Sequence, residues 1–170
     1  AFPLMSVVFN FLDMLTHGRS GSELLQEMAP NEPAFRSLVR SWFAHSSLFE
    51  MLRRLAATDS VVVLTTDHGC VMSNKATMVH GNRDTSTSLR FKFGKSLRCD
   101  PKNALFLKDP DQYGLPSVGE GTNFIFAKED YYFVYPTRFH EYQRQYANSF
   151  QHGGISMEEM ILPVAVMQGR

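Results

Sequence analysis

Two hydrophobic segments of this chain each end at an aspartate that has a histidine close behind it. The segments cover residues 4–12 and 61–66, and both contain runs of valine. The four polar side chains that follow them are Asp13, His17, Asp67 and His68. Interior strands of parallel sheets have such near-continuous apolar runs, and residues after the carboxyl ends of neighbouring strands meet in one crevice. The pattern therefore predicts an α/β fold with both Asp–His pairs at one edge of a sheet.

The residues between these two segments have the pattern of helices. Apolar positions recur at helical spacing within 34–43 and from 47 to about 57, and a shorter helix is expected near 23–28. Ser47 and Glu50 have the spacing of a capping box. A helical crossover of this kind makes the two strands parallel. We therefore expect a mostly parallel sheet with flanking helices.

The second half of the chain is expected to hold shorter elements. Residues 71–88 are polar and lack periodicity, which is typical of a functional loop. Residues 122–127 and 131–135 flank a charged turn and predict an antiparallel hairpin. Further strands are expected at 91–93, 104–107 and 161–167, and a helix at 138–146.

Three cations, Arg83, Arg90 and Lys92, belong to the polar loop region. Such groups either bind a phosphate oxygen when a loop closes over a crevice, or remain solvated. We expect solvation as the default.

Composition limits the class of protein. A chain of 170 residues is long enough for one domain with its own core. It has 17 basic and 17 acidic residues, so no overall charge attracts nucleic acid or an acidic membrane. No apolar run approaches the roughly 20 residues of a membrane-spanning helix. Cys70 and Cys99 form no spaced motif, and we expect reduced thiols in a cytoplasmic protein.

A third histidine, His152, precedes two glycines near the C-terminal end. Carboxylates and imidazoles that converge on one crevice are ligands for zinc or a similar divalent ion. Each residue also has a structural interpretation. Asp13 and His17 have a spacing that occurs by chance in surface helices, Asp67 has the position of a turn cap, and His152 has that of a surface turn. Spacing alone does not decide between these interpretations.

Three segments resemble the later motifs of the PglZ domain, a member of the alkaline phosphatase superfamily. They are NFLDMLTH (10–17), TTDHG (65–69) and HGGISMEE (152–159). Residues 41–46 and 81–90 resemble more closely one branch, the PorX-type response regulators of Bacteroidetes, which are associated with type IX secretion. The resemblance covers nearly the whole chain in motif order. It implies an alkaline phosphatase-like fold truncated on its N-terminal side, with residues 1–170 as the C-terminal portion of a PglZ domain.

The resemblance also implies two zinc ions in the intact domain. Asp13, His17 and His152 would bind one ion, and Asp67 and His68 the other. In the family, an earlier strand adds another aspartate and the Thr or Ser that attacks phosphorus. We expect that segment to be absent here, so we assign no catalytic residue. The fragment is then expected to be inactive, with partial or no metal occupancy.

Two functions agree with this resemblance. In the first, the parent protein hydrolyses phosphate esters, with nucleotide diesters as the leading substrate class, inside a two-component response regulator. In the second, the domain is a non-catalytic module that docks a sigma factor or a secretion-system protein. An upstream strand ending in Asp-Thr or Asp-Ser would favour the enzyme. A truncated sheet exposes apolar strand edges, so we also expect a homodimer or strand exchange.

Overall fold

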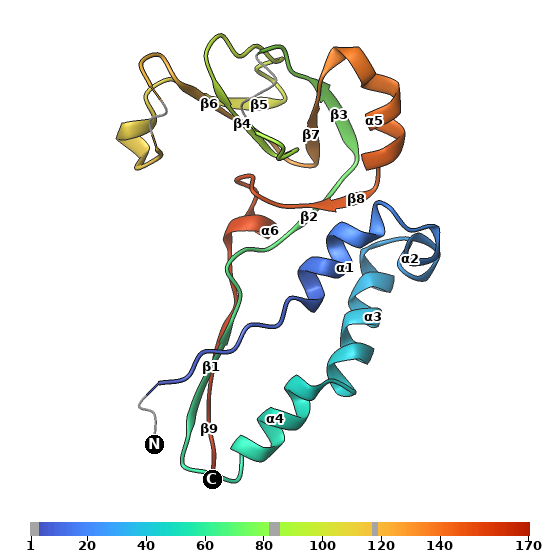
Figure 1. The fold of residues 1–170 in the computed structure, drawn as a ribbon, viewed down its shortest axis with the longest axis vertical. Coiled ribbons are helices and arrows are strands. Elements are labelled where there is room, and N and C mark those ends of the chain that lie inside the picture. The colour runs from blue at the N-terminus through green and yellow to red at the C-terminus, as the bar shows by residue number, and fades with distance from the viewer. Residues whose placement is uncertain (1–3, 82–85, 117–118) are drawn as a thin grey trace. The chain divides into compact units, whose positions relative to one another are not determined.

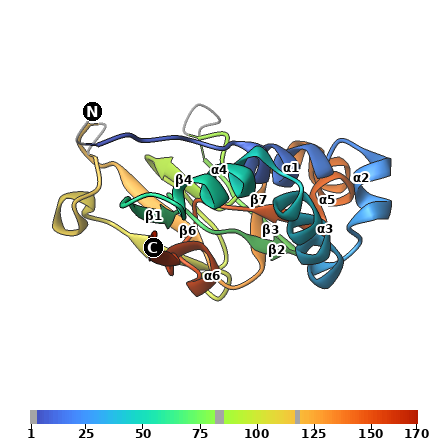
Figure 2. The ribbon, with the colours of Figure 1, turned by 90° about the horizontal axis from the view of Figure 1, so that it is seen from below.

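The computed structural model describes residues 4–81, 86–116 and 119–170. The chain divides into two compact units, and the ribbon is drawn in Figures 1 and 2. Unit 1 consists of Ala1–Leu64 and Val164–Arg170, and unit 2 consists of Thr65–Pro163. No helix in the described ranges combines the length and apolarity that a bilayer span requires.

Unit 1 is mainly helical. Its helices are α1 (Phe11–Arg19), α2 (Glu23–Met28), α3 (Glu32–Ala44) and α4 (Ser47–Leu55). The first three lie side by side in both views. Side chains of Ser22, Asn31 and Ser46 cap α2, α3 and α4 by accepting a bond from a backbone N–H of the first turn. The helices predicted at 23–28, 34–43 and 47–57 are thus confirmed, but the cap of α4 is Ser46 and not Ser47.

The predicted strand at 4–12 is wrong. Residues 4–9 form neither helix nor strand, and α1 begins at Phe11. The Phe11 ring stacks on Trp42 of α3 with a centroid distance of 4.2 Å. The buried Arg19 at the end of α1 donates through Nε to the carbonyl oxygen of Ala29, at 2.7 Å. These tertiary contacts favour the helix from Phe11 onward, whereas Val7 and Val8 lie in the irregular segment before it.

The loss of that strand also removes the predicted parallel crossover. β1 (Val61–Thr65) pairs instead with β9 (Val164–Gln168), in a two-stranded sheet. The remaining strands are β2 (Val71–Ser73), β3 (Lys75–Met78), β4 (Phe91–Gly94), β5 (Ala104–Leu107), β6 (Asn123–Ala127), β7 (Tyr131–Val134) and β8 (Ser149–Gln151). Unit 2 also holds α5 (Phe139–Tyr146), α6 (Met157–Met160) and the 3-10 helices η2 (Pro110–Tyr113) and η3 (Pro136–Arg138).

Pairing in unit 2 is largely antiparallel. β2 pairs antiparallel with β8, and β4 and β5 flank β6 in an antiparallel sheet. β3 and β7 are parallel. The α/β content is therefore confirmed, whereas the mostly parallel sheet is wrong. The predicted hairpin of 122–127 and 131–135 is also wrong, because β6 pairs with β4 and β5 while β7 pairs with β3.

The core of unit 2 lies around β6. Its buried residues are Val79, Leu97, Ala104, Ile125, Ala127 and Phe133. α5 is attached to β7 by the Tyr132 hydroxyl, which donates to the carbonyl oxygen of Gln143 at 3.1 Å. Consecutive residues of β6 and of β7 are buried, so both faces of these two strands are covered.

The predicted polar loop at 71–88 contains β2 and β3. The expected solvation of Arg90 and Lys92 is also wrong, since these side chains are 0% and 2% exposed. Lys92 lies on β4 and donates through Nζ to the carbonyl oxygen of Ser86 at 2.7 Å. Arg83 lies outside the described residues. Arg90 bonds to Glu159, 69 residues further along the chain, and sequence periodicity carries no information on such a partner.

Candidate functional site

Asp13 and His17 lie on α1 and not in a loop after a strand. A helix brings residues four apart onto one face, and here Asp13 Oδ1 lies 3.3 Å from His17 Nε2. Both side chains are about half exposed. Two donor atoms at about 2.0–2.1 Å from a tetrahedral zinc lie about 3.3 Å apart. The pair therefore has the spacing of two ligands of one ion, and equally that of an ion pair when His17 is protonated.

Asp67 and His68 follow β1 after one intervening residue, Thr66, near the start of unit 2. Asp67 Oδ1 accepts a bond from the backbone N–H of His68 at 3.1 Å, as the turn-capping interpretation predicts. The same oxygen lies 3.9 Å from His68 Nε2. Donor atoms of one tetrahedral zinc lie about 3.3 Å apart, so this separation is wider than the spacing of two ligands of one ion. The observed bond is that of the turn cap, and the ligand role of Asp67 stays a prediction.

The ring of His68 is oriented by its own chain. Nδ1 lies 3.1 Å from the carbonyl oxygen of Gly69. A carbonyl oxygen only accepts, so this bond assigns the proton to Nδ1 and the lone pair to Nε2. Histidines that bind metals commonly donate their second ring N–H in this way. The donor atom that faces Asp67 is therefore the one able to bind a cation.

His152 lies against His68 within unit 2. The two rings stack with a centroid distance of 3.9 Å and an interplanar angle of 8°. The stack joins two histidines that are far apart in sequence and that the family resemblance assigned to two different ions. It places two imidazoles, with Asp67 beside them, in one small region at the end of β1 and the loop after β8.

Two residues that sequence reasoning did not select support these loops. The Glu159 carboxylate accepts from Arg90 Nε and Nη2 at 2.9 and 2.8 Å, and from the backbone N–H groups of Gly154 and Ser156 at 2.8 and 3.1 Å. Burial alone would raise the pKa of Glu159, but the bonds and charge of Arg90, together with the bonds from Gly154 and Ser156, hold this pKa below its ordinary value of 4.5. The capping-box spacing of Ser156 and Glu159 was the available sequence signal.

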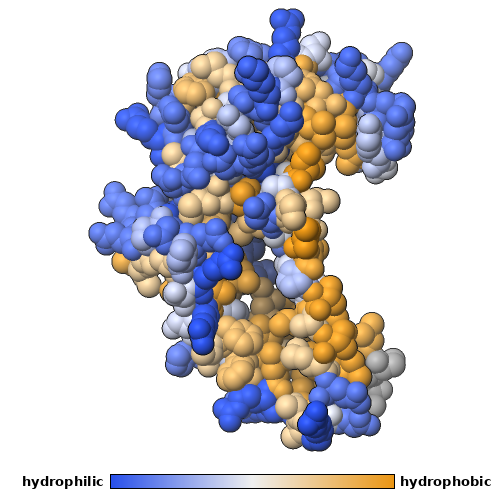
Figure 3. Space-filling model, turned by 180° about the vertical axis from the view of Figure 1, so that it is seen from behind, coloured by the Kyte–Doolittle hydropathy of each residue, from blue (hydrophilic) through white to orange (hydrophobic). Residues whose placement is uncertain are grey.

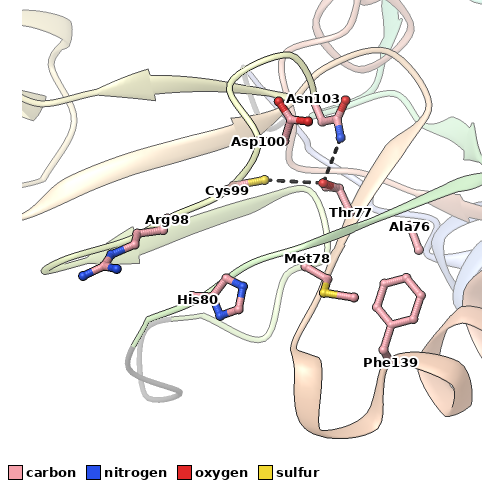
Figure 4. A pocket seen from close by; sticks show the side chains of 9 residues that line it. All are labelled: Ala76, Thr77, Met78, His80, Arg98, Cys99, Asp100, Asn103 and Phe139. Carbon is pink, nitrogen blue, oxygen red and sulfur yellow. Dashed lines mark hydrogen bonds between the residues drawn. The ribbon is translucent and has the colours of Figure 1, made fainter.

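A separate cavity of about 440 Å³ lies elsewhere in unit 2 (Figure 4). Its wall includes Thr77 of β3, whose hydroxyl accepts from Asn103 Nδ2 at 3.1 Å and contacts Cys99 Sγ at 3.5 Å. Burial raises the pKa of the Cys99 thiol, so this thiol stays protonated and weakly nucleophilic at neutral pH. None of the five predicted ligands lines this cavity.

The comparisons with known proteins name the family. A family model described as the BREX system PglZ alkaline phosphatase-like domain matches residues 3–167. The chain belongs to the PglZ family. Among curated proteins, none matches the chain. The motifs at 10–17, 65–69 and 152–159 therefore indicated the family correctly, while the closer relation to PorX-type response regulators stays a prediction.

The five predicted ligands of this PglZ chain are divided between its units. Unit 1 contributes Asp13 and His17, which have ligand spacing on α1. Unit 2 contributes Asp67, His68 and His152. Within each unit, therefore, the structure brings predicted ligands together. Carboxylates and imidazoles are ligands for zinc or a similar divalent ion.

Proposed function

We propose that this chain forms part of a metal-dependent phosphoesterase module of the PglZ type, with zinc as the metal. The observation that carries the proposal is the His68–His152 stack at 3.9 Å, with Asp67 Oδ1 at 3.9 Å from His68 Nε2. Membership of an alkaline phosphatase-like family supports phosphate-ester chemistry for such a site.

In this proposal, Asp13, His17 and His152 bind one ion, and Asp67 and His68 bind a second. Bound divalent cations would supply the positive charge that stabilises the attacking and leaving oxygens in phosphoryl transfer. The chain's own contribution is orientation. The bond from His68 Nδ1 to Gly69 holds the imidazole with its lone pair on Nε2. The turn of α1 holds Asp13 and His17 side by side.

No residue of 1–170 is assigned the role of nucleophile. By the resemblance, that group is a Thr or Ser on an earlier strand of the family's domain. Because the proposed ligands are the residues on which the proposal depends, metal binding is its direct test. The finer parts of the proposal follow the same resemblance. They are hydrolysis of nucleotide diesters, a place in a cytoplasmic response regulator and a role in type IX secretion.

The experiment is a zinc titration of the metal-free chain by calorimetry, combined with elemental analysis of the purified protein. The wild type is expected to bind zinc, and the double variant Asp67→Ala/His68→Ala is expected to lose one class of site. His45→Ala is the matched control, because His45 is exposed and bonds only locally to Ser41 at 2.8 Å. A wild type without affinity for zinc, or a double variant that binds as the wild type does, would refute the metal proposal.

One observation favours a second function, that of an interaction module. In unit 1, Val61, Val63, Val164 and Val166 on β1 and β9 are each more than half exposed. We propose as the alternative that this surface pairs with a second copy, by dimerisation or strand exchange, or with a sigma factor or secretion-system protein. Light scattering over a concentration series tests the second copy. A monomer at every concentration would exclude pairing with a second copy.

A further inference from the structure

The most strongly buried charges of unit 2 form a pair that the proposed chemistry does not use. The side chains of Arg90 and Glu159 are 0% and 1% exposed, and their bonds are bidentate, at 2.9 and 2.8 Å. Arg90 Nη1 also donates to the carbonyl oxygen of Tyr131. Burying an ion pair is costly unless its remaining polar atoms are bonded, and here they are. A buried ion pair is weak evidence for a gain in stability. We therefore asked which other segments the bonds of this pair hold in place.

The bonds of Glu159 lead to both histidine loops. Its carboxylate accepts from the backbone N–H of Gly154, two residues after His152, at 2.8 Å. Its backbone oxygen accepts from the N–H of Gly69, directly after His68, at 3.0 Å. One residue therefore holds the two loops whose imidazoles stack at 3.9 Å. Arg90 fixes the carboxylate end of that connection.

The two glycines show how closely the loops approach Glu159. A Cβ on Gly69 would lie 1.9 Å from the carbonyl oxygen of Glu158. A Cβ on Gly154 would lie 2.6 Å from Glu159 Oε2 and 2.9 Å from Arg90 Nε. Any side chain at either position would displace a loop from the residues that hold it. The close approach to Glu158, Glu159 and Arg90 therefore requires glycine at positions 69 and 154.

We propose that Arg90 and Glu159 are positioning residues that set the distance and orientation of His68 and His152 for metal binding. The inference rests on the proposed metal function of those histidines. The path is short: Glu159 holds the Gly69 backbone, and the Gly69 carbonyl accepts the His68 Nδ1 proton. The bond to Gly69 uses the backbone oxygen of Glu159, and the carboxylate holds this residue in place through Arg90 and Gly154. Loss of the carboxylate therefore loosens the residue that holds Gly69, and with it the bond that fixes the tautomer of His68.

The test uses Glu159→Gln and the double variant Arg90→Met/Glu159→Gln. The first keeps the shape of residue 159 and leaves Arg90 without its counter-charge; the second also removes that buried cation, which protects the fold. Asp130→Asn is the matched control, since the Lys75–Asp130 pair at 2.9 Å lies in unit 2 and bonds to neither histidine loop. The measurements are zinc affinity by titration and the His68 tautomer by ¹⁵N NMR on metal-free protein.

Both Glu159 variants are expected to bind zinc about 10–100-fold more weakly, the usual effect of removing an outer-shell partner. They should also show a mixed His68 tautomer, while Asp130→Asn behaves as the wild type. Folded variants with wild-type affinity and an unchanged tautomer would overturn the positioning role. A wild type that binds no zinc would remove the metal proposal, whereas the tautomer would still report on positioning.

A measurement on the wild type covers the case in which both variants unfold. Amide hydrogen exchange should show Gly69 N–H and Gly154 N–H protected to a similar degree, because both bond to Glu159. Exchange of either amide at the rate of an open loop would contradict the proposed connection.

Discussion

The two units of this chain differ in how far their apolar side chains are buried. In unit 2, Val79, Ile125 and Ala127 are 0% exposed and belong to one core. In unit 1, Val166 on β9 is 67% exposed, and the neighbouring apolar residues of β1 and β9 are also accessible. Figure 3 shows hydrophobic residues, coloured orange, exposed on part of one face. A two-stranded ribbon is marginal by itself, so unit 1 has more apolar surface than its described residues cover.

Charge follows the same division. The ion pairs of α3 and α4, Glu32–Arg36 and Glu50–Arg54, join exposed side chains one helical turn apart. Pairs of this kind contribute about 0.3–0.5 kcal/mol each. The Arg90–Glu159 pair of unit 2 is fully buried, and removing one partner of such a pair costs about 3–5 kcal/mol. Unit 2 therefore depends on specific long-range contacts, while the ion pairs of unit 1 are local.

The largest expected effect is that of truncating the core of unit 2. Phe133→Ala removes a ring that is 1% exposed, and we expect a loss of about 3–5 kcal/mol from the free energy of unfolding of unit 2. The matched change Val166→Ala should alter stability by less than about 0.5 kcal/mol, because that side chain is already exposed.

The measurement follows the two units separately during denaturation in urea. Trp42, the single tryptophan, lies on α3 and reports on unit 1 by fluorescence. Hydrogen exchange of the β6 amides reports on unit 2. Equal losses from Phe133→Ala and Val166→Ala would show that the two units do not differ in packing as described.

The next effect concerns Lys92 and pH. Burial lowers the pKa of Lys92 to about 8, from an ordinary value of 10.5. Below pH 8, both the folded and the unfolded chain carry the proton, so the full cost of burying the ammonium opposes folding, about 3 kcal/mol. Between pH 8 and 10.5 the folded state releases this proton while the unfolded state keeps it, so this residue's contribution to stability rises with pH.

Lys92→Met isolates that contribution. The free energy of unfolding of the wild type, minus that of the variant, is expected to rise from pH 7.5 to 10.5. The difference cancels the opposite trend of Cys99 and Tyr132, whose pKa values burial raises. Urea denaturation at steps of half a pH unit measures it. A flat difference curve would show that the Lys92 ammonium is not buried as strongly as its 2% exposure indicates.

The sequence predicted elements of the fold much better than their partners. Helices at 23–28 and 34–43 were found because apolar spacing and caps are local signals. The strands β6 and β7 were also found, but their hairpin was wrong because pairing depends on β3, β4 and β5. The prediction of a strand at residues 4–12 was wrong for a related reason. Their valines favour a strand, but residues 4–9 form no strand, and α1 begins at Phe11, whose ring stacks on Trp42.

The candidate site divides in the same manner. The four-residue spacing of Asp13 and His17, together with the family resemblance, suggested that they act together, and α1 places their donor atoms 3.3 Å apart. The contact of His68 with His152 joins distant segments, and no periodicity predicts it. Arg90 was assigned to a solvated loop because its partner Glu159 lies far along the chain. Sequence spacing therefore identifies candidate metal ligands that are close along the chain. The contacts that hold these ligands in place join distant segments and depend on the fold.

The smallest expected effect tests the local character of unit 1 at the start of α4. The Ser46 hydroxyl accepts from Phe49 N at 3.1 Å and donates to the carbonyl oxygen of Phe43 at 2.8 Å, so one side chain connects the end of α3 to the start of α4. Ser46→Ala should therefore destabilise α4 by about 1 kcal/mol. Ser47→Ala, at the position that the sequence pattern favoured as the cap, should be nearly neutral. Hydrogen exchange of the α4 amides measures both, with the β6 amides of unit 2 unchanged. A larger loss from Ser47→Ala, or an equal loss in unit 2, would contradict both the observed cap and the local stabilisation of unit 1.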